Sequence, residues 1–231
     1  MNNVNNKVSV LMSVYNNEKD ISNSIKSVIN QTHKNIELLI VDDGSQDNTL
    51  KICKEQAKEH KNIKLYENNK NIGLTKSLNK LIDFASGDYI ARQDADDVSD
   101  LKRIEKQLKF LHSKNLDACC TRANIKNTKK IIPGFSFYIP LKMIINFKNP
   151  FIHGTLLIKK DTLNKLGNYD ERFIYSQDYR LMKNLILSSY KVKIMNETLY
   201  KLNMENNISN KFKDDQKYYA DCVKKDLDPT I

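Results

Sequence analysis

The chain has 231 residues, 40% of them apolar, and a formal net charge of +10. This length and composition indicate one globular domain with a sizeable core and exclude wholesale disorder. No stretch approaches the ~18–20 apolar residues of a transmembrane helix, and the polar start, Met1–Lys7, is unlike a signal peptide. The four cysteines form no CxxC pair, so we expect reduced, cytoplasmic thiols that fill the core.

The positive charge is concentrated in one segment. Residues 101–165 carry 14 basic and 3 acidic side chains, whereas residues 1–100 carry 13 and 15. A local excess of this kind indicates a surface that meets an anionic partner, such as nucleic acid, lipid headgroups or a phosphorylated ligand.

The first hundred residues alternate the patterns of buried strands and amphipathic helices. Apolar runs predict strands at 8–15, 36–41, 63–66 and 88–91. Helical spacing predicts helices at 21–29, 48–59 and 75–84. Strands and helices that alternate with short connections predict a parallel sheet with right-handed crossovers, and therefore an α/β fold.

The pattern changes after residue 100. We expect a helix at 101–112 and strands at 116–121, 155–158 and 191–195. An amphipathic helix is expected at 178–187 and a polar helix at about 205–226. Residues 122–150 contain three prolines and are predicted to be irregular. Both halves are expected to share one sheet.

Ligands of open parallel sheets bind beyond the carboxyl ends of the strands. This rule selects Ser13–Asn17, Asp42–Ser45 and Gln93–Asp97, and the last two are acidic. Five carboxylates at one edge repel each other unless donors or a cation compensate, and a divalent cation bound together with substrate phosphates would do so. Taken singly, each acidic segment is also a good turn or helix cap. GxGxxG and GxxxxGK[ST] are both absent, which excludes the two common glycine-rich phosphate loops.

Four motifs in order resemble those of the family 2 glycosyltransferases, over about residues 7–200. They are VSVLMSVYN (8–16), IVDDGS (40–45), NIGL (71–74) and DADD (94–97), with Gln177-Asp178 downstream. The resemblance implies the GT-A fold, with a Rossmann-like, mostly parallel central sheet flanked by helices and an irregular acceptor-side half. It implies a single catalytic domain over 1–231, made of a nucleotide-sugar-binding half (1–100), an acceptor-side half (101–204) and a C-terminal helical tail (205–231).

The resemblance also implies a donor site. Ser13, Val14 and Tyr15 match positions that line the nucleobase, and Asp42 and Asp43 match the carboxylates that bind a uracil-type ring. Lys76 lies beside the NIGL motif, where a cation meets the diphosphate. Asp94 matches the first acid of the DxD motif, near the ribose. Asp96 matches the acid that binds Mn²⁺ or Mg²⁺, and Asp97 would support it.

Catalysis is assigned in the same way. Asp178 matches the base that takes the proton from the acceptor hydroxyl, while His153 and Gly154 are placed in the donor or acceptor pocket. Gln177 departs from the Glu-Asp pair of the family, which weakens any role that needs two carboxylates. In-line attack by the activated hydroxyl inverts the anomeric centre.

The absence of Trp excludes the QxxRW motif of processive relatives. We therefore expect a non-processive transferase that moves a hexosyl or N-acetylhexosaminyl group, most simply from a UDP-sugar. Family analogy places its saccharide or lipid-linked acceptor in bacterial surface-polysaccharide or lipooligosaccharide synthesis. The basic segment 101–165 would face the acceptor and an anionic membrane at the cytoplasmic side.

Three other interpretations stay open on the sequence. Asp94–Val98 fits DxDx[VT], a motif of haloacid-dehalogenase-type phosphatases, although there it directly ends a strand. The basic segment would suit a nucleic-acid-binding module, but no recognised motif accompanies it and the acidic cluster opposes it. Gln177 would also suit a catalytically degenerate partner subunit.

Overall fold

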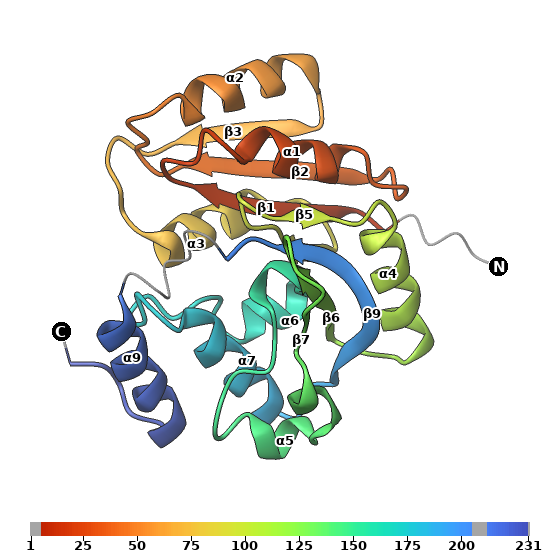
Figure 1. Cartoon of the computed structure of the whole chain (residues 1–231), viewed down its shortest axis with the longest axis vertical. Coiled ribbons are helices and arrows are strands. Elements are labelled where there is room, and N and C mark those ends of the chain that lie inside the picture. Colours follow the sequence, from red (N-terminus) through yellow and green to blue (C-terminus); the bar gives the residue numbers. More distant parts are fainter. Residues whose placement is uncertain (1–5, 205–211, 231) are drawn as a thin grey trace.

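The computed structural model describes residues 6–204 and 212–230. Within these residues nine strands form one sheet in the order β3-β2-β1-β4-β8-β6-β9-β5, and β7 pairs with β6 (Figure 1). The strands are β1 (Val8–Val14), β2 (Ile36–Asp42), β3 (Ile63–Glu67), β4 (Tyr89–Arg92), β5 (Val98–Ser99), β6 (Ala118–Ile125), β7 (Ile131–Ile132), β8 (Leu157–Lys159) and β9 (Val192–Leu202).

The pairing changes direction between the two halves of the sheet. Strands β1 to β4 are parallel, whereas β8 runs antiparallel to both β4 and β6. The sheet is therefore continuous from the first half of the chain into the second. The expected α/β class and the shared sheet are both confirmed.

Each face of the sheet carries a hydrophobic core because successive strand residues point to opposite sides. Along β1, Val10 and Met12 pack on one face, and Leu11 packs on the other. The first face is covered by α1 (Ile21–Ile29), α2 (Thr49–Glu59) and α4 (Arg103–Ser113). The second is covered by α3 (Leu74–Phe84), α5 (Leu141–Ile144), α6 (Lys160–Lys165), α7 (Gln177–Leu187) and α9 (Lys213–Lys225).

The second half of the chain contains more regular structure than its sequence predicts. Strand β9 continues to Leu202 and arches along β6 (Figure 1). The segment expected to be irregular contains β7, the short helix η1 (Phe135–Tyr138) and α5. The turn η2 (His153–Thr155) precedes β8. Of the tail helix expected at 205–226, the structure shows Lys213–Lys225, and 205–211 lie outside the described residues. None of the helices in the described ranges is long and apolar enough to cross a bilayer.

Candidate active site

The carboxyl ends of β1, β2 and β4 meet at one edge of the sheet. In the parallel register, Val14 lies beside Asp42 and Leu11 lies beside Arg92. The three segments selected from the sequence therefore emerge side by side. At this edge Val14 is buried, Ser13 is half-buried, and Tyr15 is 45% exposed.

The buried carboxylates of Asp42 and Asp43 bind the backbone of neighbouring loops. Asp42 Oδ1 accepts a hydrogen bond of 2.9 Å from the Ser45 amide. Asp43 accepts bonds from the amides of Ile72 (3.0 Å) and Gly73 (2.9 Å). Asp43 therefore ties the DDGS turn to the NIGL loop, where Gly73 has φ +91°, a conformation that favours glycine. Lys76, on α3 just after this loop, is exposed.

Asp94 is held by a buried cation. The Arg92 side chain is fully buried, and its Nη2 lies 2.6 Å from Asp94 Oδ1. The Asp94 side chain is 31% exposed, so the site retains access to this carboxylate. Buried Gln93 closes the loop by donating to the carbonyls of Asp94 (3.1 Å) and Asp97 (3.0 Å).

The remaining two acids of the DADD loop have raised pKa values. Burial and the nearby Asp94 charge raise the pKa of Asp96 to about 6. Asp97 is 1% exposed, and burial, Asp94 and Asp96 raise its pKa to about 9. Asp97 Oδ1 accepts a 2.6 Å hydrogen bond from the Asn203 amide. Ionisation of all three carboxyl groups at once is therefore disfavoured unless a cation or further donors compensate the charge.

This arrangement fits a divalent cation that is shared with a substrate. Among residues 6–204 and 212–230, no three His, Cys, Asp or Glu side chains are grouped so that they could hold a metal by themselves. A cation such as Mg²⁺ commonly uses one or two carboxylates and takes its other ligands from phosphates and water. Asp96 would supply such a carboxylate, and the raised pKa of Asp96 marks the charge that a cation would offset.

The turn η2 packs directly against Asp94. A Cβ atom on Gly154 would lie 2.7 Å from Asp94 Oδ2 and would also contact the Tyr200 hydroxyl. That hydroxyl accepts a 3.1 Å hydrogen bond from the Asp94 amide. The fully buried Arg103 donates to the Gly154 carbonyl at 2.8 Å and so fixes the turn from behind.

His153 is held in the same turn as an uncharged side chain. Burial and the Arg92 charge lower its pKa well below the usual value. Its Nε2 lies 2.7 Å from the Tyr169 hydroxyl. A neutral, hydrogen-bonded His153 therefore adds no positive charge to this turn.

Asp178 lies on the first turn of α7, directly after Gln177. Its Oδ2 accepts a 2.8 Å hydrogen bond from Asn149 Nδ2. Burial, followed by the Asp94 charge, raises its pKa. Asn149 lies five residues before Gly154, which packs against Asp94, so this short segment connects α7 with the DADD loop. Gln177 is 7% exposed.

Four residues of this site have no role in the sequence interpretation: Arg92, Arg103, Asn149 and Tyr200. Arg92 precedes the acidic motif by two positions, and an arginine in an otherwise apolar strand was an available signal. The other three come from α4, the segment before η2, and β9, and only the fold brings them together.

The profile of the family described as Glycosyl transferase family 2 matches residues 9–182. The chain belongs to this family. A curated relative in Escherichia coli, UDP-Glc:alpha-D-GlcNAc-diphosphoundecaprenol beta-1,3-glucosyltransferase WfgD, is 32% identical over 213 residues, which are 90% of this chain and 81% of WfgD.

Solved structures of GT-A glycosyltransferases share the fold. Staphylococcus aureus TarS 1–349 in complex with UDP-GlcNAc superposes with a TM-score of 0.75 at 21% identity, over 87% of this chain and 59% of that chain. The mannosyltransferase PcManGT from Pyrobaculum calidifontis, in complex with GDP-Man and Mn²⁺, superposes with a TM-score of 0.74 at 18% identity, over 93% of this chain and 61% of that chain. The present chain thus spans about three fifths of the length of each of these two solved structures. The expected GT-A fold and glycosyltransferase class are confirmed.

Proposed function

We propose that this family 2 glycosyltransferase is an inverting, metal-dependent enzyme that moves a sugar from a UDP-sugar to a hydroxyl of a saccharide or lipid-linked acceptor. The convergence of three distant segments carries the proposal. Asp94 after β4, Gly154 in η2 and Asp178 on α7 lie around one site, because Gly154 packs against Asp94 and Asn149, five residues before Gly154, donates to Asp178. Sugar transfer requires a donor-side carboxylate and a base at one site.

The donor would lie along the edge formed by β1, β2 and β4. Ser13, Val14 and Tyr15 would line the base, together with Asp43 and its neighbour Asp42. Lys76 would meet the diphosphate, and Asp94 the ribose. Mn²⁺ or Mg²⁺ on Asp96, with Asp97 behind it, would stabilise the leaving diphosphate by several kcal/mol. The TarS complex with UDP-GlcNAc supports a UDP-sugar, and the PcManGT complex supports Mn²⁺.

Asp178 would act as the general base. Its carboxylate takes the proton of the acceptor hydroxyl while the oxygen attacks the anomeric carbon from the side opposite the diphosphate, which inverts the centre. The raised pKa of Asp178 makes it a stronger base than an exposed aspartate. Asn149 orients the carboxylate, and Gln177 and His153 border the acceptor side.

The acceptor is proposed from the relatives and from charge. WfgD is named for a diphosphoundecaprenol acceptor, which supports a role in bacterial surface-polysaccharide or lipooligosaccharide synthesis. An acceptor of this kind would place the enzyme in the cytoplasm, at the inner face of the membrane. The basic surface of residues 101–165 would then face anionic lipid.

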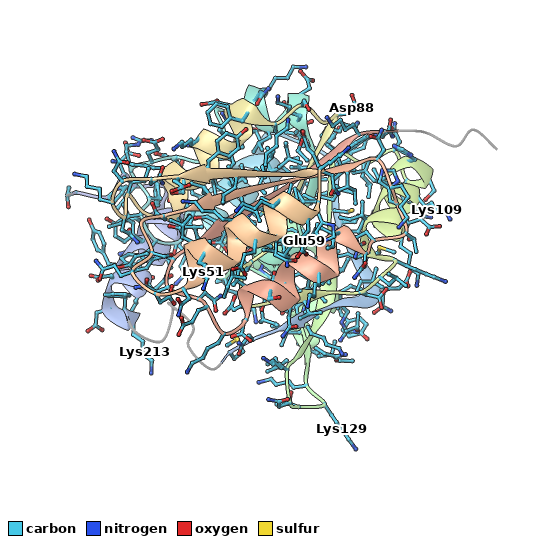
Figure 2. All side chains as sticks on the ribbon, turned by 90° about the horizontal axis from the view of Figure 1, so that it is seen from above. Lys51, Glu59, Asp88, Lys109, Lys129 and Lys213 are labelled. Atoms are coloured by element: carbon cyan, nitrogen blue, oxygen red, sulfur yellow. The ribbon has the colours of Figure 1, made fainter. Side chains whose placement is uncertain are left out.

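The test separates donor binding from chemistry. Titration of UDP-Glc and UDP-GlcNAc with and without Mn²⁺ should show metal-dependent binding that Asp96→Asn abolishes. Asp178→Asn should keep that binding. It should lower the rate of sugar transfer, or of the slow hydrolysis of the donor, by about 10²–10⁴-fold. Asp88→Asn is the matched control, because Asp88 is exposed at the opposite, amino end of β4 (Figure 2).

Each outcome decides one part of the proposal. If a panel of nucleotide sugars shows no binding with Mn²⁺ present, the chain is not a catalytic transferase, and the partner-subunit interpretation gains support. If Asp178→Asn retains full transfer, another group is the base.

A further inference from the structure

The most exposed large apolar side chains of the described residues all lie in one short segment. Phe135 is 82% exposed, Phe147 72%, Tyr138 70% and Met143 59%. They fall within thirteen consecutive residues, 135–147, between β7 and η2. Single exposed apolar residues are ordinary on a protein surface, but a group of this kind indicates an interaction site.

The local fold holds these side chains outward. Around α5, Ile144 and Ile145 are buried, and the Ile145 carbonyl accepts a 2.6 Å hydrogen bond from the Tyr179 hydroxyl on α7. Met143 and Phe147 are four residues apart on the continuing helical turn, so they share its outer side. The segment is therefore anchored on one side and apolar on the other.

All charged side chains of the stretch that carries this group are basic. Residues 118–160 contain eight Lys and Arg residues and no Asp or Glu. Lys142 and Lys148 are exposed and alternate with Met143 and Phe147. Figure 2 shows another lysine of this stretch, Lys129, at the tip of a loop that projects from the body of the protein.

We propose that the segment docks onto the interface of an anionic lipid bilayer. Its docking patch consists of Phe135, Tyr138, Lys142, Met143, Phe147 and Lys148. Aromatic rings and methionine enter the headgroup boundary, where Tyr is favoured, while lysines reach anionic headgroups. The alternative occupant is a protein partner with an acidic rim, which a lack of vesicle binding would favour.

The docking patch leads directly into the site. Asn149 follows Lys148 and donates the hydrogen bond to Asp178. Docking would thus hold the base close to the bilayer surface, where the hydroxyl of a lipid-linked acceptor is presented. This last step rests on the proposed function, whereas bilayer binding itself does not.

The chain has no Trp, so a single introduced one reports its own surroundings. Phe147→Trp in the full chain should give a blue shift of emission with vesicles containing phosphatidylglycerol, and none with pure phosphatidylcholine. The matched control is Phe84→Trp. Phe84 is 44% exposed on α3 and lies outside both the docking patch and the basic segment 101–165, so its emission should not shift.

Loss-of-binding variants complete the test. Phe135→Ser/Tyr138→Ser/Phe147→Ser should weaken flotation with anionic vesicles by more than about tenfold, with an unchanged melting temperature. Lys142→Gln/Lys148→Gln should weaken flotation with anionic vesicles less than the triple variant does. Added salt should remove the difference between this lysine variant and the wild type. Unchanged flotation of the triple variant, or equal binding to neutral vesicles, overturns the proposal. A concentration-dependent dimer that the triple variant abolishes, without vesicle binding, would instead assign the patch to a second copy of the chain.

UDP-sugar binding measured on the same variants keeps the two proposals apart. Intact donor binding together with unchanged flotation refutes the docking patch and leaves the enzyme. If the wild type binds vesicles but no UDP-sugar, the docking patch stands and the proposed enzymatic function is refuted.

Discussion

One missing side chain sets how closely the turn η2 approaches the DADD loop. Gly154 leaves room for Asp94 Oδ2 and for the Tyr200 hydroxyl at the position where any other residue would place its Cβ. Arg103, bound to the Gly154 carbonyl, prevents the turn from moving back. A substitution here must therefore displace the carboxylate, the tyrosine or the turn.

Gly154→Ala should lower both stability and donor affinity. Overpacking of a buried position costs about 1–3 kcal/mol, and displacement of Asp94 should weaken metal-dependent UDP-sugar binding by about tenfold. The measurements are thermal unfolding and calorimetric titration. Gly134→Ala is the control, since a Cβ there has its nearest neighbour, the Ile131 carbonyl oxygen, at 3.9 Å. Equal stability and affinity for Gly154→Ala and the wild type would show that the turn yields freely.

The acidic residues of the site were predictable, but their supports were not. Asp94, Asp96 and Asp178 stand in short motifs, and chemistry restricts which residue types can serve there. Arg103 and Tyr200 act from other elements, through contacts that no local pattern encodes. Asp43 was predicted as a base-binding residue, and the structure adds its three hydrogen bonds to the loop at Asn68–Gly73.

At the scale of elements, one buried carboxylate joins β1, β2 and the turn before β4. Glu37 on β2 has a side chain that is 5% exposed. Its carboxylate accepts hydrogen bonds from Ser9 Oγ at 2.6 Å and from the Ser86 amide at 2.7 Å, and Lys64 Nζ lies 3.0 Å away. Burial alone would raise its pKa, but these bonds outweigh burial and lower it from 4.5 to about 2.

Glu37→Gln should destabilise the protein by about 2–3 kcal/mol at pH 7, because an amide cannot replace all the accepted bonds. A carboxylate with a depressed folded-state pKa stabilises above its unfolded pKa. That stabilisation is therefore lost as the pH falls from 4.5 toward 2. Urea unfolding at several pH values should show the variant and the wild type converging over this range.

Glu67→Gln on β3 is the matched control. Glu67 pairs with Lys54 at 2.9 Å, but both side chains are nearly half exposed, so its loss should cost less than about 1 kcal/mol. Equal costs for the two substitutions, or no convergence at low pH, would contradict the role of Glu37.

The strands of the first half were predictable because buried parallel strands are nearly continuous apolar runs. Strand β9 was predicted to end at Met195, yet it reaches Leu202. Its further residues include the polar Asn196 and Glu197, which lie at a break in the register with β6. The strand continues beyond this break because residues 198–202 pair with β6 and β5. Tertiary pairing of this kind overrides local propensity. The two-residue strands β5 and β7 are too short to produce a pattern at all.

At the scale of the whole molecule, the sheet joins the slightly acidic first hundred residues to the basic second part of the chain. Strand β4 of the first half pairs with β8, and β8 pairs with β6 of the second. Cores on both faces draw residues from both halves: Leu11 and Cys120 share one, and Cys53 and Cys119 share the other. We therefore expect residues 6–204 to unfold as one cooperative unit.

Cysteine reactivity tests this cooperativity. Cys53, Cys119, Cys120 and Cys222 are free and buried, and burial raises the pKa of Cys53 and Cys119 to about 12. Thiolates are the reactive form, so labelling requires opening of the fold. Thiol labelling would be carried out under native conditions with low urea and followed by peptide mass spectrometry. Cys53 and Cys119 should be labelled at the same rate, and this rate should depend on urea as global unfolding does. Cys222, on the terminal helix α9, should label no more slowly. Labelling of Cys53 at a clearly different rate from Cys119, with a shallower urea dependence, would show that residues 6–100 and 101–204 open separately and act as two domains.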